Sequence, residues 1–221
     1  MFGLASGHAG KCLDVPTRGK GMIVTIASHK GGVGKTTTAF HLAAFFQSLA
    51  PTLLLDGDET RNATAWSKRG EGVSFKVADE VQAAKLARDF AHIVIDTGQR
   101  PKQIDLRALA EGCDLLIVPT VPATLDTEGL VLTIEALTAI GASSYKVLLT
   151  KVPPLPETEG LLLRSELAGQ GIPLFAADIP RLKAFEKAAA QGVPVSLVED
   201  PRAKRAWEAY EAVGKETLSH A

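Results

Sequence analysis

One short segment limits what this chain can fold into more than any other. Directly after an apolar run at 22–27 come the residues SHKGGVGKTTT, which occupy positions 28–38 and lead into an apolar helical stretch. A strand, a glycine-rich turn, a Lys-Thr pair and a helix in this order are what a phosphate-binding loop requires. The strict pattern GxxxxGK[ST] would place glycine at position 29, where this chain has His29. The segment is therefore interpreted as a deviant P-loop, and a purely structural glycine turn is the weaker alternative.

The residue types of this loop fit phosphate chemistry. Gly31, Gly32 and Gly34 allow backbone N–H groups to converge on phosphate oxygens. A helix that starts at Lys35 directs its positive end at the same point. We therefore expect Lys35 to reach the β- and γ-phosphates of a nucleotide and Thr36 to coordinate Mg²⁺.

Short runs rich in leucine and β-branched residues alternate with helical stretches from Met22 onward. Because these runs are apolar along their whole length, both faces of the sheet must be covered by helices. The predicted fold class is α/β: a doubly wound, mostly parallel sheet in a single P-loop domain. Strands are predicted at 22–27, 52–56, 92–96, 114–118 and 145–150, with weaker ones at 73–77 and 174–177. Helices are predicted near 35–49, 79–89, 103–111, 125–140, 159–169, 181–190 and 201–216, the last capped by Asp200 with Pro201 at its first position.

Three aspartates follow predicted strands. Asp56 and Asp58 belong to DGD at the end of the second strand, and Asp96 ends the HIVID run. Open α/β sheets bind their ligands at the carboxyl ends of the strands. One of these carboxylates is expected to hold Mg²⁺ through water and another to position an attacking water. A single aspartate at such a point would more often be a solvated turn residue, so this prediction depends on the P-loop.

Charge and cysteine content exclude other classes. The 24 Lys and Arg residues balance 25 Asp and Glu, so any contact with nucleic acid must be a local patch. Two cysteines, Cys12 and Cys113, are too few for a disulfide framework. The longest apolar runs are far shorter than the ~20 residues of a membrane-spanning helix.

These residues resemble the ParA/MinD group of deviant-Walker P-loop ATPases, and within it the small ParA-like partition and positioning ATPases. The resemblance runs from Met22 to about Lys215, and KGGVGKTT at 30–37 is its most specific element. It implies that Lys30 reaches across a dimer interface to the phosphates bound by the other subunit, so that two ATP molecules lie between two chains.

The resemblance also assigns roles to the carboxylates and the loop. It implies that Asp58 activates water, and that Asp56 and Asp96 join Thr36 at Mg²⁺. The nucleotide-binding residues that it implies are Lys30, Gly31, Gly32, Val33, Gly34, Lys35, Thr36 and Thr37. After the second aspartate this chain has Glu59, Thr60 and Arg61 where relatives commonly have Pro-Gln-Gly, so we expect the switch that couples hydrolysis to partner contact to differ in detail.

The same resemblance predicts an ATPase that forms a homodimer on binding ATP. It would use nonspecific double-stranded DNA as a matrix, respond to a ParB-like or adaptor protein, and work in the cytoplasm in association with the nucleoid. Its cargo is left open between a plasmid, a chromosome region and a protein compartment such as the carboxysome.

A local basic cluster is the predicted DNA contact. Six basic residues stand between positions 181 and 205 against three acidic ones, a local charge of +3 on a chain whose total is −1. The alternative is a solvated helix face. The predicted DNA-binding residues are Arg181, Lys183, Lys187, Arg202, Lys204 and Arg205.

The base site is open between two interpretations. Lys151 and Pro153 follow the fifth strand, where relatives of this fold often contact adenine, but a rigid solvated proline loop has equal weight. Residues 1–21 are interpreted as a loose tail or a mis-assigned start, which leaves 22–221 as the ATPase domain.

Three other functions compete. A metabolic ligase or kinase on the same P-loop is the runner-up and would not need Lys30. A membrane oscillator would need a C-terminal helix with a basic rim, whereas here acidic and basic residues mix, so no membrane partner is expected. An iron–sulfur electron carrier would need two cysteines per subunit, and only Cys113 lies inside the domain.

Overall fold

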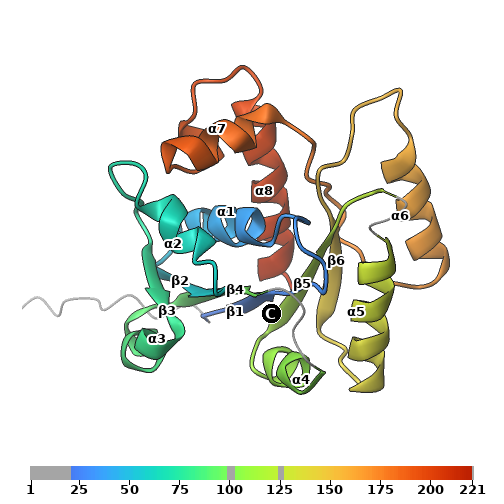
Figure 1. Ribbon diagram of the computed structural model, residues 1–221, viewed down its shortest axis with the longest axis horizontal. Helices are drawn as coiled ribbons and strands as arrows, with labels where there is room; N and C mark the ends of the chain where they lie inside the picture. The colour runs from blue at the N-terminus through green and yellow to red at the C-terminus, as the bar shows by residue number, and fades with distance from the viewer. Residues whose placement is uncertain (1–20, 99–102, 124–126, 221) are drawn as a thin grey trace, which may run out of the picture.

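The computed structural model describes residues 21–98, 103–123 and 127–220 (Figure 1). Its six strands are β1 (Ile23–Ile26), β2 (Thr52–Gly57), β3 (Lys76–Asp79), β4 (His92–Thr97), β5 (Leu115–Thr120) and β6 (Tyr145–Leu149). They form one sheet in the order β3-β2-β4-β1-β5-β6, and every pair is parallel. All carboxyl ends of the strands therefore meet at one edge.

Helices cover both faces of this sheet. They are α1 (Lys35–Gln47), α2 (Asn62–Ser67), α3 (Glu80–Leu86), α4 (Gln103–Glu111), α5 (Thr127–Ala139), α6 (Glu159–Gly169), α7 (Lys183–Gln191) and α8 (Ala203–Leu218), with short 3₁₀ turns at Ala87–Asp89 and Val195–Leu197. The buried clusters place α1, α2, α7 and α8 on one face and α3 to α6 on the other, as Figure 1 shows. The predicted α/β fold with a parallel sheet is confirmed.

The alternation of side chains along the strands explains the two faces. Leu115 and Ile117 of β5 point into the cluster under α1 and α8, while Leu116 and Val118 point into the cluster under α4, α5 and α6. Because successive strand residues face opposite sides, a strand buried on both faces must be apolar throughout. This is the physical origin of the uninterrupted apolar runs in the sequence.

The structure differs from the predicted elements in several places; the strand expected at 73–77, for example, is β3 at Lys76–Asp79. The strand expected at 174–177 is an isolated bridge between Leu174 and Val147, because the Leu149 carbonyl oxygen, the next acceptor along β6, accepts from the Ile179 N–H at 2.9 Å and the ladder does not continue past Phe175. Helix α2 was not predicted. Helix α8 begins at Ala203, two residues after the expected start, because the Asp200 carboxylate accepts a hydrogen bond from the Arg202 N–H at 2.8 Å in a turn that precedes the helix.

Two further predictions concern the N-terminal tail and membrane-spanning helices. The tail expected at 1–21 lies, apart from Gly21, outside the described residues. No helix in the part of the chain that the structure describes is both long and apolar enough to span a bilayer.

His41 ties α1 to the C-terminal part of the domain. Its ring is fully buried and stacks on Tyr210 of α8, with ring centroids 4.7 Å apart. Its Nδ1 lies 2.7 Å from the Thr37 carbonyl oxygen and must donate, so Nε2 is the acceptor for the Val195 N–H at 3.0 Å. A proton on Nε2 would remove the second bond. Burial accordingly lowers the pKa of His41 to about 4.

This buried ring predicts acid destabilisation. The unfolded chain binds a proton at His41 near pH 6.5 and the folded chain only near pH 4, so stability is lost as the pH falls through this window. The loss attributable to His41 between pH 7 and pH 5 is about 2 kcal/mol. Urea unfolding of the wild type and of His41→Gln at both pH values measures it as the difference between the two pH dependences. Identical pH dependences in the two proteins would contradict the assignment.

Candidate functional site: a P-loop at the carboxyl edge of the sheet

The P-loop takes the shape that phosphate binding needs. It leaves β1 after Ile26, and Gly32 and Gly34 have φ angles of 76° and 91°. Side chains other than glycine rarely adopt these angles, so the two glycines are required by the backbone path. Gly34 is the N-cap of α1, and the predicted start of that helix at Lys35 is confirmed. The N-terminal N–H groups of α1 therefore face the inside of the loop.

The residues directly after β6 form hydrogen bonds to backbone carbonyls of the P-loop. The Thr150 Oγ1 lies 2.7 Å from the Val33 carbonyl oxygen, and the Lys151 Nζ donates to the Gly32 carbonyl oxygen at 2.7 Å. Lys151 itself has a φ of 50°, a left-handed conformation held by these contacts. The carbonyl groups of Gly32 and Val33 are thus turned away from the inside of the loop. The N–H groups of the loop are left to face a ligand there.

Lys35 is buried at the base of the loop. Its Nζ donates to the Lys30 carbonyl oxygen at 3.3 Å. Burial lowers the pKa of Lys35, and the negative charges of Asp96 and Asp58 oppose that change. The ammonium group is therefore held close to both carboxylates.

Asp96 is the least satisfied group of the site. It is fully buried at the end of β4, and neither carboxylate oxygen has a hydrogen-bond partner within the described residues. Burial raises the pKa of Asp96 to about 7, the neighbouring Thr36 hydroxyl and Lys35 lower it, and Asp56 raises it. A buried carboxylate without a hydrogen-bond partner destabilises the folded state unless a bound cation balances its charge. This group, beside Thr36, fits a divalent cation.

Asp56 has a different environment. It lies opposite Asp96 in the β2–β4 register, yet its Oδ2 accepts hydrogen bonds from the Thr64 N–H at 2.8 Å and the Thr64 Oγ1 at 2.6 Å. Its Oδ1 lies 3.4 Å from the Asp58 nitrogen. Asp56 thus fixes the first turn of α2 to the end of β2, a role that the sequence did not reveal.

Asp58 is held by the residues directly after it. It is 6% exposed, and its Oδ1 accepts hydrogen bonds from the backbone N–H of Thr60 at 2.9 Å and from the Thr60 hydroxyl at 2.7 Å. The carboxylate is close enough to Lys35 to affect its pKa. The structure therefore brings Asp56, Asp58 and Asp96 together with the P-loop, as the strand-end positions predicted.

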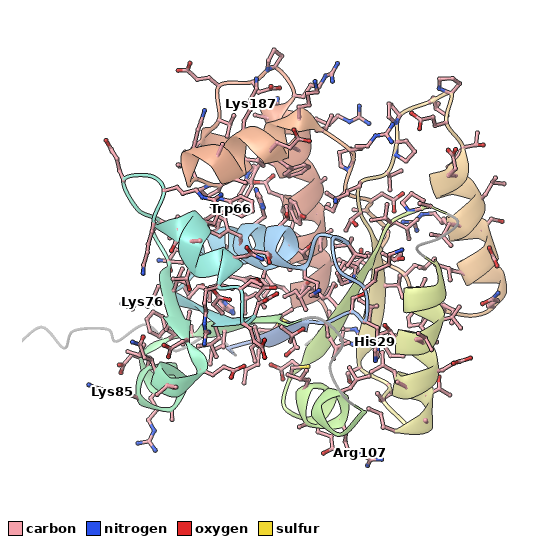
Figure 2. The ribbon with its side chains drawn as sticks, viewed as in Figure 1. His29, Trp66, Lys76, Lys85, Arg107 and Lys187 are labelled. Carbon is pink, nitrogen blue, oxygen red and sulfur yellow. The ribbon has the colours of Figure 1, made fainter. Side chains whose placement is uncertain are left out.

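The aliphatic stem of Lys30 lies against α5. A Cβ atom added at Gly129 of α5 would lie 2.8 Å from the Cβ of Lys30, so the lysine stem needs this glycine. The preceding His29 lies near α5 in Figure 2, and its backbone nitrogen and its Nδ1 contact the Thr133 Oγ1 at 3.2 and 3.0 Å. His29, where a strict P-loop would have glycine, thus fastens the loop to α5.

A cavity of about 700 Å³ adjoins the P-loop at Thr37. Lys151 lines it, as does Pro154 rather than its neighbour Pro153, together with Ile179, Pro180 and residues of α7 and α8. Its walls are largely apolar with charged groups at the rim. It is large enough for a nucleobase and a ribose. The sequence pointed to this region, but the contribution of α7 and α8 could not be foreseen.

The six predicted DNA-binding residues lie on the segment before α7, on α7, and around the start of α8, and Figure 2 shows Lys187 at the outer surface of α7. Three of them form ion pairs: Arg181 with Glu157, Lys187 with Asp200 and Lys204 with Glu208. Arg181, Arg202 and Arg205 line a second hollow of about 170 Å³. Arg181 and Arg202 also line the larger cavity, so the basic surface and the cavity are contiguous.

Cys113 and His92 lie at the amino ends of β5 and β4, at the opposite edge of the sheet from the P-loop. Burial raises the pKa of the Cys113 thiol and lowers that of His92, which favours the neutral form of each. No group of three His, Cys, Asp or Glu in the described ranges is arranged to hold a metal ion by itself. A cation at Asp96 would therefore need oxygen ligands from a bound phosphate or from water.

Comparison with known families and proteins agrees with this geometry. Residues 24–195 match the CobQ/CobB/MinD/ParA nucleotide-binding domain. The chain belongs to this family of nucleotide-binding domains. A member from Gloeobacter kilaueensis, the "Maintenance of carboxysome distribution protein A", is 33% identical over 200 residues, which are 88% of this chain and 93% of the relative.

Solved structures of this CobQ/CobB/MinD/ParA family share the fold. The ATP complex of a McdA variant from Cyanothece has a TM-score of 0.70 at 19% identity and covers 90% of this chain and 97% of its own. The MinC:MinD cell division protein complex of Aquifex aeolicus has a TM-score of 0.72 at 15% identity, with 90% and 96% covered. At these identities the likeness concerns the fold alone.

Proposed function

We propose that this protein is a Mg²⁺-dependent ATPase that pairs into a homodimer on binding ATP and positions a cargo over nonspecific double-stranded DNA. The observation that carries the proposal is the placement of two lysines in one loop. Lys35 is buried beside Asp58 and Asp96, whereas the stem of Lys30 lies against α5. We infer from this difference that Lys35 serves the nucleotide of its own chain and that Lys30 serves the nucleotide of a second chain.

The name of the Gloeobacter relative refers to carboxysome distribution, which favours a protein compartment as the cargo. A cargo of that kind needs an adaptor protein to connect it with the ATPase and to stimulate hydrolysis. The protein would work in the cytoplasm and associate with the nucleoid through DNA.

The residues of the site have distinct tasks in ATP hydrolysis. Bound ATP supplies the phosphoanhydride that is cleaved, and Mg²⁺ neutralises charge on its phosphate oxygens. Lys35 counters the charge of the β- and γ-phosphates, while the Thr36 hydroxyl and the Asp96 carboxylate would hold the metal. Asp56 already accepts hydrogen bonds on both oxygens, so its contribution to the metal would pass through water. Asp58 would orient the attacking water.

We place the nucleobase in the 700 Å³ cavity, where Thr37 connects it with the P-loop. Ile179, Pro180 and Leu182 provide apolar surface for a base, and Arg181 and Arg202 line both this cavity and the adjoining basic hollow. A nucleotide bound in the cavity would therefore contact these two arginines and affect their positions.

The proposed function makes a prediction about pairing of the chains. Asp58→Ala should bind ATP without turning it over and remain a dimer, because ATP held at the interface is not hydrolysed. Lys30→Ala should bind ATP as a monomer, because the phosphate that it contacts belongs to the other chain. Light scattering with ATP and Mg²⁺ measures both, and an Asp58→Ala protein that stays monomeric at saturating ATP would contradict the sandwich arrangement.

A second pair of variants tests the placement of Lys30 by α5. Gly129→Ala introduces a Cβ at 2.8 Å from the Lys30 stem and should weaken pairing as Lys30→Ala does. Gly169→Ala at the end of α6 is the matched control, because an added Cβ there meets nothing within 4 Å. Equal pairing by Gly129→Ala and the control would show that the contact with α5 does not position Lys30.

The next prediction concerns DNA. Arg202 lines the cavity proposed for the nucleobase and is therefore left unchanged. Replacement of Lys204 and Arg205 by Glu should abolish binding of random duplex DNA and spare ATP binding. Replacement of the exposed Lys85 and Lys215 by Glu changes the net charge equally at distant points and should leave DNA binding intact. Fluorescence anisotropy with ATP and with ADP measures the affinity, whose logarithm should fall with log salt by about 0.9 per phosphate neutralised.

Equal DNA affinity in the ATP and ADP states, or equal loss in both double variants, would remove the basic surface from the proposal. A metabolic ligase or kinase would then explain the P-loop better. The two functions are separated by ATP turnover, which random duplex DNA should accelerate in a positioning ATPase and leave unchanged in a metabolic enzyme.

A further inference from the structure

The turn between β2 and α2 contains a directed set of hydrogen bonds. The Asn62 Nδ2 lies 2.8 Å from the Thr60 Oγ1, and this Oγ1 lies 2.7 Å from the Asp58 Oδ1. An amide nitrogen can only donate, so the Thr60 hydroxyl accepts from Asn62 and its own proton points at Asp58. The direction of each bond is thereby fixed.

The two oxygens of Asp58 are consequently unequal. Oδ1 accepts from both the hydroxyl and the backbone N–H of Thr60. Oδ2 makes no hydrogen bond to another described residue, and the Asp58 side chain as a whole is mostly buried. The carboxylate is therefore held in one rotamer with one oxygen left to accept a hydrogen bond.

The rest of the turn keeps this arrangement in place. The Arg61 N–H donates to the Asp58 carbonyl oxygen at 2.9 Å, and the Arg61 side chain donates to the Asp56 carbonyl oxygen. Arg61 has a φ of 51°, a conformation that non-glycine residues rarely adopt and that the surrounding contacts must stabilise. The turn thus connects the end of β2 to the start of α2, and Asp58 lies at its centre.

We propose that Thr60 is a positioning residue for hydrolysis, which fixes Asp58 through Oδ1 and leaves Oδ2 to orient the attacking water, and that Asn62 sets the direction of the Thr60 hydroxyl. This inference rests on the role proposed for Asp58. It assigns tasks to two residues of this turn.

The test separates orientation of Asp58 from folding and binding. Thr60→Val keeps the branched side chain and the backbone N–H but removes the hydroxyl. Loss of this charge-assisted bond should lower kcat about tenfold while the ATP Kd changes less than about twofold. Thr60→Ser restores a hydroxyl and should return kcat to within about twofold of the wild type. Single-turnover hydrolysis with Mg²⁺, nucleotide titration and Tm are measured for the full chain of each variant.

Unchanged or faster hydrolysis by Thr60→Val, a loss of ATP affinity equal to the loss of kcat, or no rescue by Thr60→Ser would overturn the inference. Should Thr60→Val fail to fold, Asn62→Ala carries the test, because it leaves both donors of Thr60 present and should still lower kcat about threefold.

A final comparison distinguishes this inference from the proposed function. Thr60→Val should have no further effect in an Asp58→Ala background. Wild-type turnover by Asp58→Ala would refute the role of Asp58 itself, whereas an inactive Asp58→Ala with a fully active Thr60→Val would refute only the role of Thr60.

Discussion

The candidate site is built around charged groups that are buried at the carboxyl edge of a parallel sheet. Lys35 and Asp96 are both buried there, and the carboxylate of Asp96 has no hydrogen-bond partner within the described residues. Such a group destabilises a domain of this size unless a ligand compensates for it. The surrounding elements hold this edge rigid: Thr150 and Lys151 fix the loop carbonyls, and Asp56 fixes α2. The unpartnered carboxylate lowers the stability of the fold, and a bound nucleotide and cation would offset that loss.

The sequence predicted the fold well because its signals are local and repeated. Apolar strands, the glycines of the P-loop and the Lys-Thr pair each constrain a few adjacent residues, and the parallel sheet then brings the strand ends together. Asp96 and Asp58 could be placed at the site for that reason. Helix α2 was missed because its short NATAWS segment has no apolar periodicity, and it is held by the Thr64 contact with Asp56.

Contacts between distant segments could not be predicted from one sequence. The approach of Gly129 to Lys30 joins residues about a hundred positions apart, and so does the contact of His29 with Thr133. The ion pair of Arg181 with Glu157 likewise reduces a basic cluster that looked stronger in the sequence. These contacts decide how each lysine and arginine is used, and they follow from the fold rather than from local pattern.

The most direct test of this account is the thermal stability of Asp96→Asn with and without ATP and Mg²⁺. If the buried carboxylate exists to complete a metal site, the Asn variant should have a higher Tm than the wild type in the absence of nucleotide. It should also lose the additional rise in Tm that Mg²⁺ gives to the ATP-bound wild type. An Asn variant that is less stable without nucleotide and retains the full Mg²⁺-dependent rise would contradict the account.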